Sequence, residues 1–398
     1  MKILDLSMLL FFPADTGGKA GIFHRIIGLA HEHDVCAVIV NSENDIIKLN
    51  NEFNIPQNMR IYINSAVTKP INETNSIEKM LQTIKWLISN KPRMACKISD
   101  SNLRRKITKI VNEYKPDLIY LESPFVYELL NWNQIDRKKT KVINVVHNQE
   151  VEFFKAANNW PLILKNIEID RIKKYERYIM RFSDGVNCVA PEDALYGQDI
   201  VGDKCRYVPS YLAKSEKKWS FKSATEKYIY YSGSLSFNPN LEGLLWFLNN
   251  IYSKYITNYA DVSLKITGRV NEKIKKELSK YKQVEFTGYL SDEELEDIIC
   301  NSVFTVVPVL SGGGVKMKMI EAMKYGVPAI STVHVRNGIA LSKKANVPFL
   351  YTDDPLKFVE YMNLLTENSE IRKNIARQEC NYFEEIYSSK NNLEKWVV

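Results

Sequence analysis

Residues Pro308 to Thr332 read PVLSGGGVKMKMIEAMKYGVPAIST, and they hold most of a strand–turn–helix–strand unit. The apolar, largely β-branched run from Val303 to Val309 predicts a buried strand, and three glycines follow it after a short turn. Apolar residues at helical spacing then predict a helix that starts near Val315 and ends at Gly326 as its C-cap, because Pro328 prevents its continuation. The unit is typical of a parallel α/β sheet.

The glycine-rich turn is a candidate phosphate-binding loop. Its glycines are Gly312, Gly313 and Gly314. Glycines let backbone N–H groups approach an anion, and a helix N-terminus adds about half a positive charge. Lys316 and Lys318 fall in the first turn of the expected helix. Cations there are unfavourable for the helix dipole, so their presence is better explained if they bind a diphosphate. Glu321 lies roughly 9 Å further along the axis, at a spacing that suits a ribose hydroxyl. The alternative is a plain glycine-rich turn with a solvent-facing Glu.

The alternation of strands and helices recurs through the chain. The predicted strands are Ile3–Leu10, Val35–Val40, Leu118–Leu121, Val142–Val146 and Val186–Ala190, then Tyr228–Tyr231, Leu264–Thr267, Val284–Thr287, Val303–Val309 and Ala329–Ser331. Amphipathic helical patterns separate them, which is typical of parallel βαβ units. We therefore predict two doubly wound, Rossmann-like α/β domains.

The boundary between the two predicted domains falls at a polar stretch. Residues 214–227, KSEKKWSFKSATEK, contain five Lys and three Ser with little periodicity, which predicts a linker. The expected domains are residues 1–213 and 228–380, with a last segment at 381–398. Ligands of open parallel sheets bind beyond the carboxyl ends of the strands, so the cleft between two such domains is the expected site.

Composition excludes several classes of protein. The chain has 398 residues, 45% hydrophobic and 25% charged, which argues against a disordered, collagenous or coiled-coil protein. No apolar run approaches the ~20 residues of a transmembrane helix, and we expect no signal peptide. The six cysteines are scattered without metal-ligand spacing, which favours reduced thiols in a cytoplasm and predicts no metal site.

Charge is concentrated in one segment. The net charge is +7, and residues 91–115 hold eight basic against two acidic residues. A basic surface suits nucleic acid, an anionic membrane or a phosphate-bearing substrate, but no nucleic-acid-binding signature is present. The amphipathic stretch Ile77 to Ile88, which contains Trp86, precedes the basic segment and would suit peripheral contact with an anionic membrane. The alternative is a core-facing helix followed by a solvated basic face.

Two more segments place polar groups after predicted strands. In FFPADTGGKAGIF, from Phe11 to Phe23, Gly17 and Gly18 precede an amphipathic helix and offer a second helix N-terminus. In VVHNQEVEFF, a strand ends directly before His147, where catalytic groups of parallel sheets commonly lie. The alternatives are a plain turn for the glycines and a structural hydrogen bond for the histidine.

Taken together, these motifs resemble glycosyltransferase family 4. The segments that carry the resemblance, in order, are DTGGK (15–19), HNQE (147–150), GSLSFNPNLEGLLWF (233–247), ITGR (266–269), VEFTGYLSD (284–292) and GGGVKMKMIEAMKYGVPAIST (312–332). The resemblance implies a GT-B fold, with an acceptor-binding N-terminal domain, a nucleotide-sugar-binding C-terminal domain and a last helix that crosses back to the N-terminal domain. It also implies retaining transfer of a sugar from a nucleotide-diphosphate donor, with no metal cofactor.

The resemblance also implies roles for individual residues. The catalytic positions are His147, Lys318 and Glu321, of which Glu321 matches the ribose-binding Glu of the family. The donor-binding positions are Gly18, Gly233, Ser234, Gly268, Arg269, Tyr289, Leu290, Gly312, Gly313, Gly314, Val315 and Lys316. The acceptor-binding positions are Gly17 and Lys19.

The chain departs from the family pattern at two places. Many members have a second Glu before the ribose-binding one, where this chain has Gly313. Many also carry an Arg and a Lys in the stretch where Ser234 and Asn240 stand here. The chain is more similar to a G-G-G-T-R-x-K variant group, in which the loop itself supplies the positive charge.

The expected function is assembly of a bacterial cell-surface polysaccharide or glycoconjugate. The donor would be a UDP-sugar, or a GDP-sugar, and the acceptor a saccharide or a polyprenyl-linked saccharide, with the enzyme cytoplasmic or peripheral on the inner face of the plasma membrane. The main competing hypothesis is a non-catalytic, glycosyltransferase-like partner subunit. A nucleic-acid-binding module and a GT-B epimerase or phosphorylase are weaker hypotheses, because no motif in the chain favours them.

Overall fold

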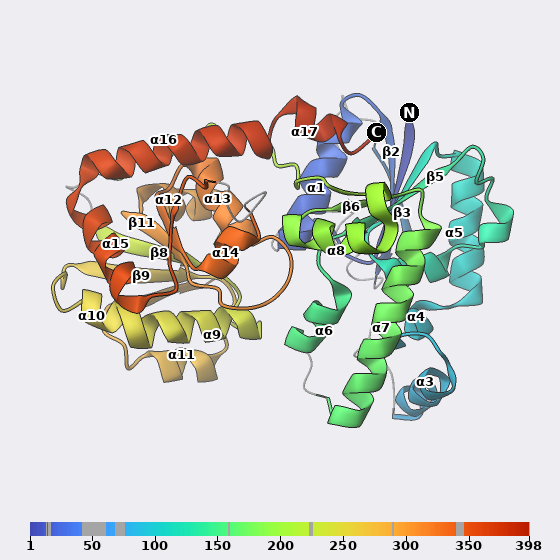
Figure 1. The fold of residues 1–398 in the computed structure, drawn as a ribbon, viewed down its shortest axis with the longest axis horizontal. Coiled ribbons are helices and arrows are strands. Elements are labelled where there is room, and N and C mark those ends of the chain that lie inside the picture. The colour runs from blue at the N-terminus through green and yellow to red at the C-terminus, as the bar shows by residue number, and fades with distance from the viewer. Residues whose placement is uncertain are drawn as a thin grey trace. The chain divides into compact units, whose positions relative to one another are not determined.

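The computed structural model describes residues 1–12, 14, 17–41, 61–67, 76–157, 160–222, 226–288, 290–339 and 346–397 (Figure 1). The chain forms two compact units. Unit 1 comprises Met1–Ala213 and Lys390–Val398, and unit 2 comprises Lys214–Ser389. Each unit is built on its own parallel sheet, so the predicted class of two doubly wound α/β units is confirmed. Among the described helices, none is long and apolar enough to cross a membrane.

Unit 1 has a seven-stranded sheet in the order β3-β2-β1-β4-β5-β6-β7, with parallel neighbours throughout. Its strands are β1 (Lys2–Ser7), β2 (Asp34–Asn41), β3 (Ile61–Val67), β4 (Leu118–Leu121), β5 (Lys141–Val146), β6 (Gly185–Cys188) and β7 (Cys205–Tyr207). The central strands are buried on both faces, which explains their largely apolar sequences, with Asp5 in β1 and Asn144 in β5 among the buried polar exceptions. The strand order reverses direction between β1 and β4, and ligands of such sheets bind at that switch point.

Helices cover both faces of this sheet. They are α1 (Gly17–Ala30), α3 (Ser76–Ile88), α4 (Arg93–Ile98), α5 (Ser101–Tyr114), α6 (Glu150–Ala157), α7 (Leu162–Phe182), α8 (Pro191–Val201) and α17 (Lys390–Glu394), with short turns η2 (Pro124–Leu129), η3 (Trp132–Gln134) and η4 (Gly202–Lys204). On one face, α1 and Trp396 pack with Ile3 of β1. On the other face, α5 and η2 pack with Leu4 and Leu6 of the same strand.

Unit 2 has a six-stranded parallel sheet in the order β10-β9-β8-β11-β12-β13. Its strands are β8 (Lys227–Ser232), β9 (Val262–Thr267), β10 (Val284–Gly288), β11 (Phe304–Val307), β12 (Ala329–Ser331) and β13 (Leu350–Tyr351). Its helices are α9 (Asn238–Phe247), η5 (Leu248–Tyr252), α10 (Ser253–Tyr255), α11 (Glu272–Leu278), α12 (Asp292–Asn301), α13 (Met317–Tyr325), α14 (Val333–Asn337), α15 (Pro355–Glu367) and α16 (Ser369–Ile386). The sheet again reverses direction at its middle, between β8 and β11.

The polar stretch expected to be a linker is bound to unit 2. The backbone N–H of Trp219 donates to Tyr325, its indole N–H donates to the carbonyl of Ser302 at 2.8 Å, and the N–H of Ser220 donates to Cys300. The stretch is therefore attached to the surface of unit 2. Its Lys- and Ser-rich composition does not show that the indole of Trp219 packs against apolar residues of that unit.

The end of the chain belongs to unit 1. Helix α16 runs past residue 380 to Ile386, and the chain joins unit 1 at Lys390. In unit 1, Leu393 packs against Gly28 of α1, and the indole N–H of Trp396 donates to the carbonyl of Pro209 at 3.3 Å. The last helical segment is thus the five-residue α17, shorter than the expected 381–398 helix.

Candidate functional site

His147 lies directly after β5, and a carboxylate fixes its position. Its Nε2 lies 2.8 Å from Oε2 of Glu122, the first residue after β4. Glu122 is buried, whereas the imidazole of His147 retains 16% exposure. The ends of the neighbouring strands β4 and β5 therefore present a partly exposed imidazole, His147, that is held by a buried carboxylate, Glu122. Composition and periodicity gave no signal for Glu122.

Glu122 is in turn held by a buried arginine. The Arg25 guanidinium of α1 donates to Glu122 at 2.6 Å and to Asp5 of β1 at 2.5 Å. It is stacked between the rings of Tyr120, at 4.9 Å, and Trp396, at 4.5 Å. Asp5, Arg25, Glu122 and His147 form a continuous chain of contacts, which we call the buried ion chain.

Burial and charge act differently on the two carboxyls of this chain. Burial opposes ionisation of Glu122, but the Arg25 charge and the His147 hydrogen bond outweigh it, so the pKa of Glu122 lies below its usual value. Burial raises the pKa of Asp5 to about 8, and the nearby Glu122 charge adds to this shift. At neutral pH the chain therefore carries a charged Glu122 between a cation and His147.

The segment after His147 is anchored by a second set of acids. The Gln149 amide donates to Asp193 of α8 at 3.1 Å, and the Glu150 N–H donates to Glu176 of α7 at 3.1 Å. Burial, with the Glu176 charge, raises the pKa of Glu150 to about 8. These contacts limit the movement of the backbone that carries His147.

In unit 2, the glycine-rich turn is closed by Lys316. Helix α13 begins at Met317, two residues later than expected, so Lys316 is its N-cap residue and lies outside the first turn. Its ammonium donates to the carbonyl oxygens of Gly312, Gly313 and Gly314 at 2.7, 2.8 and 3.0 Å. The expectation that both lysines lie in the first turn is therefore wrong for Lys316, whose ammonium holds the turn together.

Lys318 lies inside unit 2, facing the turn that follows β8. Its ammonium donates to the side-chain oxygen of Asn240 at 2.9 Å and lies 5.1 Å from the ring centre of Tyr231. Gly233 has φ +154°, which residues with a Cβ rarely adopt, and a Cβ there would lie 2.9 Å from the Lys318 Nζ, so a larger residue would strain the turn and displace the ammonium. Asn240, which stands where many family members have a cation, is thus the partner of a buried cation from another segment.

Burial shifts Lys318 and Glu321 of α13 toward neutrality. Burial, together with the Lys316 charge, lowers the pKa of Lys318 to about 7. Burial also raises the pKa of Glu321 to about 7. A buried ammonium with so low a pKa is poorly compensated, and an anion beside it would restore its charge. Titratable groups perturbed in this way are typical of functional sites.

The turn after β8 and the turn after β9 support each other. The N–H of Leu235 donates to the carbonyl of Arg269 at 2.9 Å, and the Asn240 amide donates to the carbonyl of Ser234 at 3.0 Å. Gly268 has φ +119°, and a Cβ there would lie 2.7 Å from the Gly233 oxygen. Gly233, Ser234, Gly268 and Arg269 are therefore brought together beside Lys318.

The remaining predicted positions are placed as follows. Val315 lies in the glycine-rich turn, Leu290 precedes α12, and Gly17, Gly18 and Lys19 form the start of α1. Tyr289 lies outside the described residues. Within the described residues, no group of three or more His, Cys, Asp or Glu side chains is arranged to hold a metal ion. The absence of a metal requirement stays a prediction.

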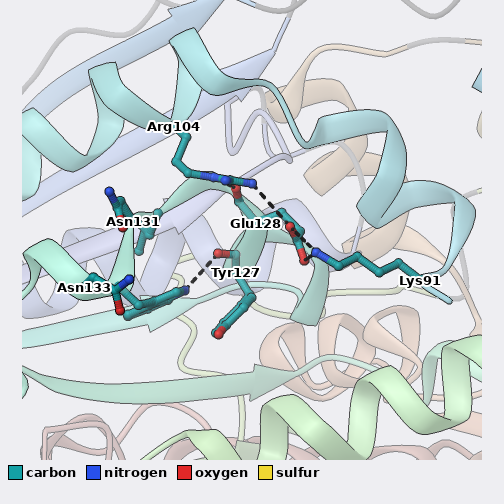
Figure 2. A pocket seen from close by; sticks show the side chains of 8 residues that line it. Lys91, Arg104, Tyr127, Glu128, Asn131 and Asn133 are labelled. Atoms are coloured by element: carbon teal, nitrogen blue, oxygen red, sulfur yellow. Dashed lines mark hydrogen bonds and ion pairs between the residues drawn. The ribbon is translucent and has the colours of Figure 1, made fainter. Parts of the chain in front are cut away.

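A pocket of about 270 Å³ lies elsewhere in unit 1 (Figure 2). Figure 2 shows Lys91 and Arg104 directed at Glu128, which also accepts a hydrogen bond from Tyr175 at 2.8 Å. The Lys91 ammonium is 2.7 Å from this carboxylate, and Arg104 donates to the Glu128 carbonyl at 2.8 Å. Two cations of the basic segment 91–115 therefore bind one buried acid, so these two charges do not simply form a solvated basic face.

A comparison with protein families finds a match in unit 2. Residues 226–368, which include Gly233, Gly268, the glycine-rich turn and α13, match the family model described as glycosyl transferases group 1. The match covers only this part of unit 2, and the chain has the GT-B fold. The resemblance to glycosyltransferases is therefore confirmed at this level, whereas retention and membership of the G-G-G-T-R-x-K group stay predictions.

Similar proteins cover nearly the whole chain. An uncharacterized 44.6 kDa protein in the cps region of Klebsiella pneumoniae is 24% identical, over 98% of this chain and 97% of that protein. Sucrose-phosphate synthase from Thermosynechococcus elongatus has a TM-score of 0.68 at 13% identity, over 100% of this chain and 97% of that one. HepE from Anabaena, solved with UDP and glucose, has a TM-score of 0.63 at 12% identity, over 100% and 98%. A variant of TarM from S. aureus, solved with fondaparinux, α-GlcNAc-glycerol and UDP, has a TM-score of 0.64 at 12% identity, over 100% and 99%.

Proposed function

We propose that the protein is a retaining hexosyltransferase that moves a sugar from a nucleotide diphosphate, UDP in preference to GDP, to a saccharide or polyprenyl-linked acceptor. The main support for this proposal is the buried ammonium of Lys318, which lies beside Gly233 and Asn240 in the region that matches the group 1 family. We assign the donor to unit 2 and the acceptor to unit 1. The similarity to a protein of a cps region favours synthesis of a surface polysaccharide.

The proposed step is a displacement on the face of the sugar from which the diphosphate leaves. The acceptor oxygen forms a bond to the anomeric carbon, the bond from that carbon to the diphosphate oxygen breaks, and the acceptor proton passes to the diphosphate. Lys318 would stabilise the charge that develops on the diphosphate, and the glycine turns would let it approach. Glu321 would accept from ribose hydroxyls, and His147, held by Glu122, would bind the transferred sugar or the acceptor hydroxyl.

The test is thermal unfolding with UDP, GDP and ADP, each with and without EDTA. A nucleotide at a hundred times its dissociation constant stabilises the folded protein by about 2.7 kcal/mol. We expect UDP to raise the melting temperature equally with and without EDTA. Stabilisation by none of the three nucleotides would contradict the donor assignment and favour the non-catalytic partner subunit, and loss of the UDP effect in EDTA would contradict metal independence.

The affinity for UDP should depend on pH through Lys318. Burial lowers the pKa of Lys318 to about 7, and a bound diphosphate would raise it again, so binding takes up a proton above pH 7. We expect the dissociation constant to rise by up to about tenfold per pH unit from pH 7 to 9. UDP itself keeps its charge there, because its last phosphate proton is lost near pH 6. Calorimetric titration in two buffers of different ionisation enthalpy measures this uptake, and a flat profile would show that the diphosphate lies away from Lys318.

A further inference from the structure

Two helices of unit 1 expose a row of large apolar side chains. These residues are between 36 and 82% exposed, and we call them the apolar face. They are Met80, Leu81, Ile84, Leu87 and Ile88 of α3, and Leu162, Ile163 and Ile167 of α7. Figure 1 shows α3 and the first turns of α7 at the same end of the unit, and Trp86 meets Trp160 with ring centres 5.6 Å apart.

Helix α3 is held with its aliphatic stripe outward. Trp86, on the opposite side of the helix, is buried, and its indole N–H donates to Glu168 of α7 at 2.6 Å. Arg171 of α7 donates to the carbonyl of Trp86 at 2.5 Å and to that of Leu87 at 3.2 Å. The exposed residues of α3 recur at three- and four-residue spacing, which is a single helical stripe. An amphipathic helix of a soluble protein turns such a stripe to the core, so the alternative of a helix with its apolar stripe facing the core is not what the structure shows.

The helices that carry the apolar face, and α4, which follows α3, also carry basic residues. Lys85, Arg93, Lys165 and Lys173 lie on α3, α4 and α7. Of the acids between residues 162 and 173 of α7, Glu168 is buried against Trp86, and Asp170 pairs with Lys174 at 2.7 Å. Contiguous exposed apolar side chains mark interaction surfaces, and a cationic border favours an anionic partner.

We propose that the apolar face docks on the surface of an anionic lipid bilayer. The aliphatic side chains would enter the boundary between headgroups and acyl chains, and the bordering lysines and arginine would meet lipid phosphates. A second copy of this chain fits less well, because a two-fold contact through the same face would bring the same cations together. The proposal goes beyond the proposed sugar transfer and does not depend on it.

The test is flotation of the full chain with phosphatidylcholine vesicles, with and without about 30% phosphatidylglycerol. We expect the wild-type chain to float with the anionic vesicles. We also expect the double variant Leu162→Glu/Ile163→Glu to bind them at least about tenfold more weakly, because it replaces inserted apolar groups by anions. Leu87→Glu/Ile88→Glu, at the end of α3, should behave in the same way. Wild-type protein that ignores both vesicles, or double variants that float like wild type, would overturn the proposal.

Matched controls separate docking from folding and from self-association. Leu195→Glu changes an equally exposed leucine of α8 in unit 1, and it should leave flotation unchanged. Melting temperatures of all variants should agree with that of the wild type, because every changed side chain is exposed. Light scattering should give one molar mass for wild type and variants, and a wild-type dimer that the double variants convert to a monomer would assign the apolar face to a second copy instead.

Discussion

Replacing Lys318 by methionine is expected to slow sugar transfer by about 10² to 10³, since removal of one preorganised donor to a developing anion has this effect. Methionine keeps an unbranched apolar side chain and removes the ammonium that donates to Asn240 and lies over the ring of Tyr231. The same change should flatten the dependence of UDP affinity on pH. Initial rates at saturating acceptor, together with UDP titrations at pH 7 and 9, measure both effects.

The stability of this variant distinguishes a functional cation from a structural one. Because burial lowers the pKa of Lys318 to about 7, the folded state binds this proton less readily than the unfolded state does. The buried ammonium therefore costs stability at pH 7, and the methionine variant should melt at the same or a higher temperature. Lys276→Met, at an exposed position of α11, is the matched control and should leave rate and stability unchanged. A slow variant that also melts much earlier would indicate that Lys318 serves packing.

The central strands of both sheets were predictable because they are buried on both faces. The run Leu118–Leu121 is continuously apolar, Val142–Val146 is apolar except for Asn144, and the observed strands match both closely. The edge strands β7 and β13 span three and two residues, too few to show a period. Sequence therefore indicates the middle of each sheet far better than its edges.

Side-chain partners in the candidate sites were less predictable than their backbone. The glycine-rich turn was visible, but the sequence does not show that Lys316 folds back onto its carbonyls while Lys318 turns inward. Arg25 bonds to residues 20 positions before it and 97 positions after it, so only tertiary structure reveals the buried ion chain. Composition identified neither Asp5 nor Glu122 as a site residue.

Helix α3 shows a related limit. Periodicity predicted an amphipathic helix over Ile77–Ile88, and the structure contains one over Ser76–Ile88. The pattern does not say which face meets the body of the unit. Trp86 fixes the orientation of the helix, because its indole N–H donates to the carboxylate of Glu168, 82 residues later in the chain.

Replacing Arg25 by methionine is expected to lower the free energy of unfolding by about 3 to 5 kcal/mol, because it leaves Glu122 charged and buried without its cation. It also removes the guanidinium stacked between Tyr120 and Trp396, so the end of the chain should dock less firmly on unit 1. Urea unfolding followed by tryptophan fluorescence measures the loss. Arg105→Met, at an exposed position of α5, is the matched control and should cost under about 0.5 kcal/mol.

The pH dependence of this loss tests its electrostatic origin. Since the folded-state pKa of Glu122 lies below its usual value, its ionised form stabilises the wild-type protein at neutral pH, and this contribution disappears as the pH falls through that pKa. In the Arg25→Met variant a neutral Glu122 is the better buried form, so acid should destabilise the variant less than the wild type. The difference between the two proteins should therefore narrow below about pH 4. A difference that stays constant with pH would instead assign the loss to the missing contacts with Tyr120 and Trp396.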